Sequence, residues 1–144
     1  FVEQDHLGWW IEEAGDPAGI ITHTEEGMAR VIDFVHSHIA HWPDLGNDRN
    51  TLYLRVTHRR FDKGTALQEL SRHLGLTPDQ VFAAGDNFND LPMLRREIAH
   101  HLVAPANSLP EVKSQVLAEG GHISPLTASR AMADAVTRLR RPTA

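Results

Sequence analysis

The stretch VFAAGDNFNDLPML, residues 81–94, decides both the fold class and the position of the candidate site. It opens with VFAAG, a short apolar run ending at Gly85 that is typical of a buried strand. The next five residues contain two acids and two amides, namely Asp86, Asn87, Asn89 and Asp90. Apolar residues return at Leu91, so the stretch predicts a strand, an oxygen-rich loop and a brief helix.

Helix and strand patterns alternate on both sides of this stretch. Upstream, one face of an expected helix ending at Gly75 carries Ala66, Leu67, Leu70 and Leu74. Downstream, HLVAP indicates the next strand, Ser108 and Glu111 are expected to cap a helix, and another helix runs to about Leu139. This alternation predicts an α/β fold, a Rossmann-like parallel sheet with helices on both faces.

The predicted sheet gives Asp86 a special position. Ligands of open α/β sheets bind outside the carboxyl ends of the strands, and Asp86 comes just after VFAAG. The oxygen-rich loop is therefore a candidate site by position as well as by composition.

The first sixty residues have a different pattern. A helical period runs from Met28 to Ile39, and TLYLRVTH alternates apolar and polar residues like a half-buried strand. Such alternation favours an antiparallel sheet covered on one side, with HWPDLGNDRN as a loop within it. We therefore expect a small α+β unit over residues 1–60 and a separate α/β unit over residues 61–144.

Composition limits the classes of function. The chain has 144 residues, 41% of them hydrophobic, a formal charge of -5 and no cysteine. Disulfides and thiolate metal sites are therefore excluded, and no apolar run approaches the roughly 18 residues of a membrane span. We expect a cytoplasmic protein with no nucleic-acid or membrane partner. Because it begins at Phe1 without an initiator Met, we also expect it to be part of a longer protein.

Oxygen ligands on a loop suit Mg²⁺, whereas zinc fits them less well. The alternative is structural, because Asp and Asn are also the residues that turns and helix N-caps prefer. Lys63 adds a second signal, since the chain has only two lysines against twelve arginines and this one begins a helix. A compact ammonium there suits a phosphate, although a solvated surface lysine is the alternative.

Together, DKGTALQELSRHLGLTPDQVFAAGDNFNDLPML resembles the C-terminal part of haloacid dehalogenase superfamily phosphatases. The resemblance is to the branch with a large α/β cap, which includes sugar-phosphate phosphatases and Cof-type hydrolases. In that family a Lys-Gly pair opens one helix and a Gly-Asp-x-x-Asn-Asp loop ends the next strand. Here the pair begins at Lys63 and the loop spans residues 85–90, within a resemblance that covers roughly residues 50–117.

The resemblance implies a role for each site residue. Lys63 would be catalytic, binding the transferring phosphoryl group and holding the aspartyl-phosphate intermediate. Asn89 would contact the phosphate, and Asp86 would be catalytic and ligate Mg²⁺ directly. Asp90 would belong to the metal site, supporting its shell or Lys63. Residues 1–60 would be the C-terminal part of the cap, and residues 61–144 that of the core.

The chain departs from the family pattern at the nucleophile. Those enzymes carry an Asp-x-Asp motif near the N-terminus, and no Asp-x-Asp occurs in these 144 residues. The resemblance therefore implies a Mg²⁺-dependent phosphatase acting through an aspartyl-phosphate intermediate, whose nucleophile lies in a missing N-terminal segment. This chain alone is expected to be inactive. Its expected substrate is a small phosphorylated metabolite, a sugar phosphate being one candidate. The alternatives are a noncatalytic phosphate- or partner-binding module and a phosphomutase of the same superfamily.

Two pairs of adjacent aromatic or histidine residues lie outside these motifs. Trp9 and Trp10 would face opposite sides of a strand, so one of them is expected to fill the core of the first unit. His100 and His101 lie at the start of a predicted strand and are expected to have no special role.

Overall fold

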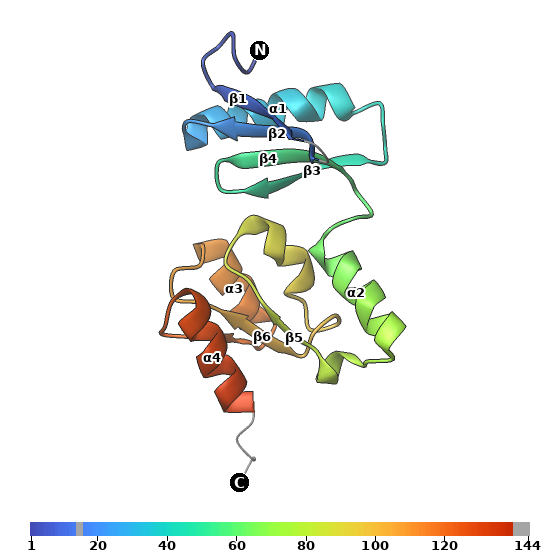
Figure 1. Cartoon of the computed structure of the whole chain (residues 1–144), viewed down its shortest axis with the longest axis vertical. Coiled ribbons are helices and arrows are strands. Elements are labelled where there is room, and N and C mark those ends of the chain that lie inside the picture. Colours follow the sequence, from blue (N-terminus) through green and yellow to red (C-terminus); the bar gives the residue numbers. More distant parts are fainter. Residues whose placement is uncertain (14–15, 140–144) are drawn as a thin grey trace. The chain divides into compact units, whose positions relative to one another are not determined.

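The computed structural model describes residues 1–13 and 16–139 of the chain. These residues divide into two compact units, the first spanning Phe1–Asp62 and the second Lys63–Ala144 (Figure 1). The second unit contains the oxygen-rich loop. That one unit is the C-terminal part of a cap and the other that of a core stays a prediction.

The first unit is a four-stranded antiparallel sheet with one helix. Its strands are β1 (Gly8–Glu13), β2 (Asp16–Thr22), β3 (Leu45–Asn50) and β4 (Tyr53–His58), in the order β1-β2-β4-β3. The helix α1 (Glu25–Ile39) lies along one side of this sheet (Figure 1). Thr24 begins α1 by accepting a hydrogen bond of 3.0 Å from the backbone N–H of Gly27.

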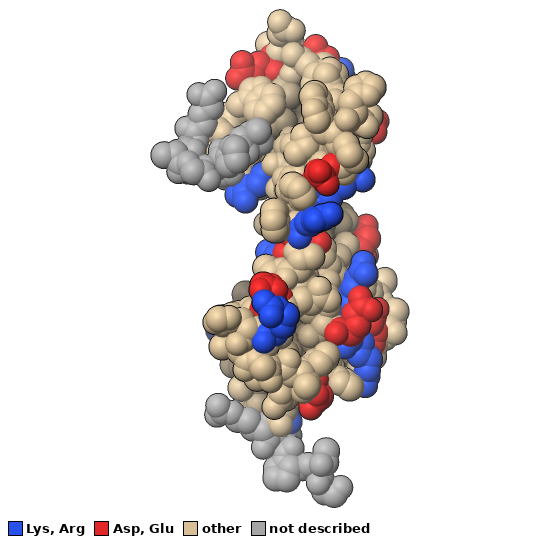
Figure 2. Space-filling view, turned by 90° about the vertical axis from the view of Figure 1, so that its right-hand side faces the viewer, with Lys and Arg blue, Asp and Glu red and all other residues tan. Residues whose placement is uncertain are grey.

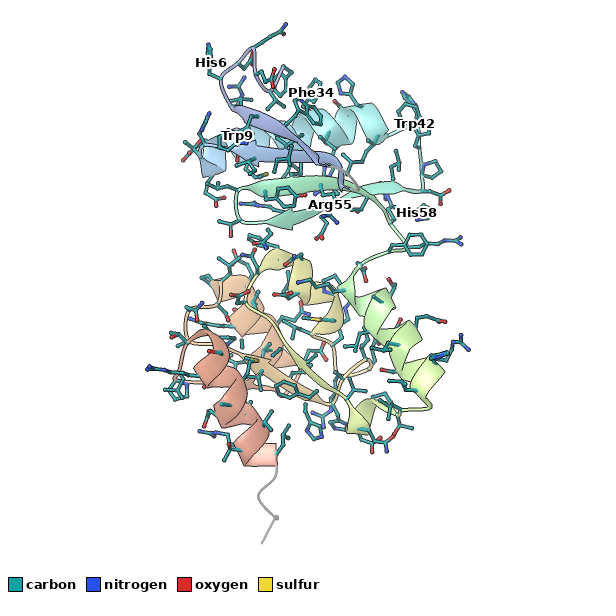
Figure 3. All side chains as sticks on the ribbon, viewed as in Figure 1. His6, Trp9, Phe34, Trp42, Arg55 and His58 are labelled. Atoms are coloured by element: carbon teal, nitrogen blue, oxygen red, sulfur yellow. The ribbon has the colours of Figure 1, made fainter. Side chains whose placement is uncertain are left out.

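The core of the first unit lies between α1 and the sheet. Ile20 and Leu54, from the two central strands, pack with Met28, Val31 and Val35 of α1. The helical period and the strand alternation predicted this arrangement correctly. Arg55, which follows Leu54 on β4, projects from the side of the sheet opposite α1 (Figure 3).

Two expectations for the first unit were wrong. HWPDLGNDRN is not all loop, because its second half forms β3, which pairs with β4 from Leu45 to Asn50. As an edge strand, β3 meets a single neighbour and tolerates a polar sequence. Neither Trp9 nor Trp10 fills the core, since they are 45% and 44% exposed on the other edge strand, β1. Figure 3 labels Trp9 on this strand.

The second unit is built on a three-stranded parallel sheet, so the predicted α/β class is confirmed. Its strands are β5 (Phe82–Ala84), β6 (His101–Ala104) and β7 (His122–Ile123), in that order across the sheet. The α-helices are α2 (Lys63–Leu74), α3 (Pro110–Ala118) and α4 (Ala128–Leu139), and the short 3₁₀ helices are η1 (Pro78–Gln80) and η2 (Phe88–Met93). The core includes Ala83 of β5, Leu102 of β6, Val112 and Val116 of α3, and Leu94, which follows η2.

The helix α2 forms where its pattern predicts, but with a different buried face. Leu70 and Leu74 are 53% and 58% exposed, while Gly64 and Ser71 are buried. The cause is that α2 packs against η2. Within the described residues, this contact buries small side chains and leaves the two leucines outside.

Among the residues that the structure describes, no helix combines the length and the apolar character of a bilayer span. Acidic and basic side chains are interspersed on the face that Figure 2 shows. The charge distribution on that face agrees with the scattered charges of the sequence.

Candidate active site

The candidate site lies where β5 ends, inside the second unit. β5 stops at Ala84, and the backbone N–H of Gly85 donates to the carbonyl of Val103 on the neighbouring strand at 3.3 Å. The chain then leaves the sheet and presents Asp86 as an exposed side chain before η2 begins at Phe88. The parallel sheet therefore positions Asp86 at its carboxyl edge, where ligands of such folds bind.

The Asp90 side chain holds the backbone of the loop by hydrogen bonds. Its Oδ2 accepts hydrogen bonds from the backbone N–H groups of Asp86 at 2.8 Å and Asn87 at 3.1 Å. Asn87 is the N-cap of η2, and its Oδ1 accepts from the N–H of Phe88 at 2.9 Å. Because Asp90 is only 4% exposed, these amides replace the water that its carboxylate would otherwise bind. The turn and capping role is therefore present in this loop.

Lys63 reaches the same carboxylate from α2. Its Nζ lies 2.5 Å from Asp90 Oδ1, while 47% of the Lys63 side chain remains exposed. The structure thus brings together Lys63, at the first residue of α2, and the loop that carries Asp86. Because it contacts a buried carboxylate, Lys63 differs from a surface lysine that contacts only solvent.

Two glycines make this geometry sterically accessible. A Cβ at Gly64 would lie 2.5 Å from the carbonyl oxygen of Pro92, so only glycine lets α2 pack this closely on η2. A Cβ at Gly85 would lie 2.3 Å from Cβ of Asp90, so only glycine lets the Asp90 side chain fold back over the loop. The ion pair between Lys63 and Asp90 therefore needs glycine at both positions, because any larger residue would clash.

A further anchor was missed by sequence reasoning. The N–H of Leu109 donates to the carbonyl of Asp86 at 3.0 Å, and the Ser108 hydroxyl donates to the carbonyl of Gly85 at 3.3 Å. Ser108 was expected to cap α3, but the N-cap residue is Leu109 and makes no side-chain capping bond. Ser108 is buried against the loop instead, and no sequence signal distinguishes that role from a cap.

Asn89 contributes a buried acceptor with no partner. Its Oδ1 is inaccessible to water and accepts no hydrogen bond from any described residue. Leaving such an atom unpaired is unfavourable, and a ligand could contact this oxygen only after the Asn89 side chain turns. In the described part of the chain no three His, Asp or Glu side chains group closely enough to hold a metal by themselves.

The arrangement places the ammonium of Lys63, on α2, beside the loop that carries the exposed Asp86 carboxylate. The ammonium of Lys63 can attract an oxyanion, while the Asp86 oxygens can bind a hard divalent ion. Bringing both charges to one edge of the sheet is what phosphate chemistry requires, because phosphoryl groups are bound by cations and metal together.

Comparison with known proteins gives the family. Residues 18–123 match the family model described as haloacid dehalogenase-like hydrolase, which is most of the chain. The chain belongs to the haloacid dehalogenase-like hydrolase family. The match begins within β2 and ends at β7, and it includes Lys63 and the whole oxygen-rich loop.

Two relatives of this chain are named phosphatases. Phosphoglycolate phosphatase of Methanopyrus kandleri is 46% identical over 55 residues, covering 38% of this chain and 23% of the relative. The HMP-PP phosphatase of Serratia proteamaculans is 47% identical over 53 residues, covering 37% of this chain and 19% of the relative. These alignments therefore span less than a quarter of either relative.

The fold is also that of solved structures. The sucrose-phosphatase from Synechocystis sp. PCC6803 superposes with a TM-score of 0.72 at 15% identity, covering 95% of this chain and 58% of that one. At this identity the likeness concerns the fold alone. It extends over both units of the chain.

We expect Gly64→Ala to destabilise the second unit, although alanine has a higher helix propensity than glycine. Propensity favours alanine by about 1 kcal/mol, but the clash with Pro92 costs about 1–3 kcal/mol. The three tryptophans and the single tyrosine all lie in the first unit, so amide hydrogen exchange of α3 and β6 is the suitable measurement. Gln68→Ala, an exposed substitution in the same helix, should change protection by less than about 0.5 kcal/mol. Increased protection in Gly64→Ala would contradict the packing role.

We expect Asp90→Asn to lower the free energy of opening of the second unit by about 1.5–3 kcal/mol, because a buried acceptor of charged and amide donors is lost. Amide hydrogen exchange of α3 and β6 measures this change as well. Glu97→Gln, which alters an exposed pair with Arg95 at 3.7 Å, should be close to neutral. Equal effects of the two substitutions would show that Asp90 does not hold the loop.

Proposed function

We propose that the complete protein is a Mg²⁺-dependent phosphatase of a small phosphorylated metabolite, with a sugar phosphate as one candidate, acting through an aspartyl-phosphate intermediate. The observation that carries the proposal is the contact of 2.5 Å between Lys63 Nζ and the buried Asp90, on the loop that exposes Asp86. The family and the phosphatases among its relatives support the reaction type.

Lys63 and Asn89 are the proposed phosphate-binding residues. The Lys63 side chain is 47% exposed while its ammonium is bonded to Asp90, and an ammonium has three donors, so it can donate a further bond to a phosphoryl oxygen. Asn89 can turn its amide toward the same group, since its Oδ1 has no partner among the described residues. Lys63 would then offset the negative charge that phosphoryl transfer leaves on the equatorial oxygens.

Asp86 and Asp90 are the proposed residues of the metal site. Asp86 has an exposed carboxylate and is the direct ligand, whereas both oxygens of Asp90 already accept hydrogen bonds. Asp90 therefore acts by holding the loop and orienting Lys63. The all-oxygen donor set fits Mg²⁺, which keeps several waters in such sites. When bound, the ion would neutralise phosphoryl charge.

The nucleophile is proposed to come from a segment that precedes these residues in the complete protein. The chain contains no Asp-x-Asp, so it would not turn over a phosphate ester alone. Within the described sheet β5 pairs on one side only, with β6. A parallel strand added along its other side would end beside Asp86, which is where an attacking carboxylate is needed.

Replacing Lys63 by arginine tests the site, and the same replacement at the other lysine serves as the control. In the complete protein, Lys63→Arg should lower the turnover of p-nitrophenyl phosphate by about 10²-fold or more, because a planar guanidinium cannot replace the ammonium between Asp90 and a phosphate. The matched control is Lys113→Arg, the only other lysine, whose Nζ donates to the carbonyl of Ala106 at 2.6 Å. Full activity in Lys63→Arg would reject this assignment. The 144-residue chain should show no turnover.

A second measurement tests the metal. Turnover in the complete protein should disappear with EDTA and return with Mg²⁺, and Asp86→Asn should raise the half-saturating Mg²⁺ concentration by at least about tenfold. Glu119→Gln is the control, because Glu119 bonds the backbone of Arg96 rather than the loop. Unchanged Mg²⁺ dependence in Asp86→Asn would remove Asp86 from the metal site.

A further inference from the structure

The backbone that leads into the Asp86 side chain is hydrogen-bonded at its donor groups. The N–H of Gly85 donates to the carbonyl of Val103 on β6 at 3.3 Å. The N–H of Asp86 donates to Oδ2 of the buried Asp90 at 2.8 Å. Both N–H groups of residues 85 and 86 therefore have a partner within the second unit.

The two carbonyl groups of the same residues are also engaged, and their donors are neighbours in the sequence. The Ser108 hydroxyl donates to the carbonyl of Gly85 at 3.3 Å, and the N–H of Leu109 donates to the carbonyl of Asp86 at 3.0 Å. All four backbone polar groups of residues 85 and 86 are thus paired. Rotation about its own side-chain bonds is the main freedom left to the Asp86 carboxylate.

Ser108 is the one partner among these four that can be changed without altering the loop or a backbone group. It lies between β6, which ends at Ala104, and α3, which begins at Pro110. Because Ser108 is only 4% exposed, water is poorly placed to replace its hydroxyl. Removing that hydroxyl would therefore remove the bond to Gly85 without supplying another donor.

The other end of the loop is held by the same helix. The Gln115 side chain on α3 donates through Nε2 to the carbonyl of Leu91 at 2.6 Å and to that of Leu94 at 2.9 Å. Leu91 lies in η2, and Leu94 is the C-cap residue of η2. One segment, from Ser108 to Gln115, thus bonds the backbone both before and after Asp90.

We propose that Ser108 is a positioning residue for the Asp86 carboxylate, which raises the affinity of the loop for Mg²⁺ without touching the ion. The inference rests on the proposed function, in which Asp86 ligates Mg²⁺ directly. A ligand whose backbone is already fixed loses less conformational freedom when an ion binds, so fixing it increases affinity. Gln115 acts in the same direction from the other end, because it fixes η2 and hence Asp90.

Amide hydrogen exchange of the 144-residue chain without added metal tests whether Ser108 fixes the loop. Ser108→Ala should speed exchange of the Asp86 and Leu109 amides by about threefold to tenfold, because one buried hydrogen bond is lost. Ser114→Ala is the matched control, since Ser114 is exposed on α3. It should leave both exchange rates unchanged.

Calorimetric titration of the complete protein with Mg²⁺ tests whether this fixation serves the metal. Ser108→Ala should raise the dissociation constant by about threefold to tenfold, with the same number of ions bound, because no ligand is removed. Gln115→Met keeps the side-chain length but removes the donors, so it should raise the constant in the same direction. Val116→Ala removes buried methyl groups from the same helix and should leave the dissociation constant unchanged.

Four outcomes decide against the proposal. Equal exchange rates in Ser108→Ala and Ser114→Ala would overturn it, because Ser108 would then not fix the loop. An equal rise of the dissociation constant in Ser108→Ala and Val116→Ala would show a general loss of stability instead of positioning. Unchanged Mg²⁺ binding in Ser108→Ala would reject the positioning role alone. Absence of Mg²⁺ binding by the unsubstituted protein would reject the proposed metal site, and this role with it.

Discussion

The buried carboxylate of Asp90 is the interaction on which the candidate site depends. One of its oxygens binds the ammonium of Lys63, and the other accepts two backbone N–H groups of the loop that carries Asp86. A buried carboxylate is costly unless it is paired and hydrogen bonded, and here each requirement is met by a different element. The same charge that stabilises the turn thereby also ties α2 to the end of β5.

Steric requirements explain why this ion pair is accompanied by glycines. Gly64 lets α2 approach η2, and Gly85 leaves space for the Asp90 side chain. Neither position has a positive φ, so the requirement is space rather than backbone conformation. The Lys-Gly and Gly-Asp-x-x-Asn-Asp motifs thus each supply one charged residue of the ion pair and one glycine that makes room for it. The structural and functional explanations of the loop are therefore compatible, because Asp90 shapes the turn while leaving Asp86 exposed.

The two ends of the parallel sheet carry different chemistry. At the end of β5 an exposed acid stands beside an ammonium, whereas a cavity of about 320 Å³ near the starts of β6 and β7 is lined by imidazoles and a guanidinium. A carboxylate lies behind a cation in both places, Asp90 behind Lys63 and Asp134 behind Arg138. In each case the acid neutralises part of the cation and limits its movement.

The sequence alone determined the α/β class, the amphipathic helix α1, the strand β5 and the placement of an oxygen-rich loop after it. These features follow from local periodicity and from chain order, which are properties of neighbouring residues. Only the tertiary structure decided which faces are buried: Leu70 and Leu74 fit a helical period but lie outside, because the contact of α2 with η2 selects Gly64 and Ser71 instead. It also decided that Ser108 anchors the loop and that three histidines line one cavity, since residues distant in sequence meet at both places. Such contacts depend on how elements pack, and no local pattern of side chains encodes them.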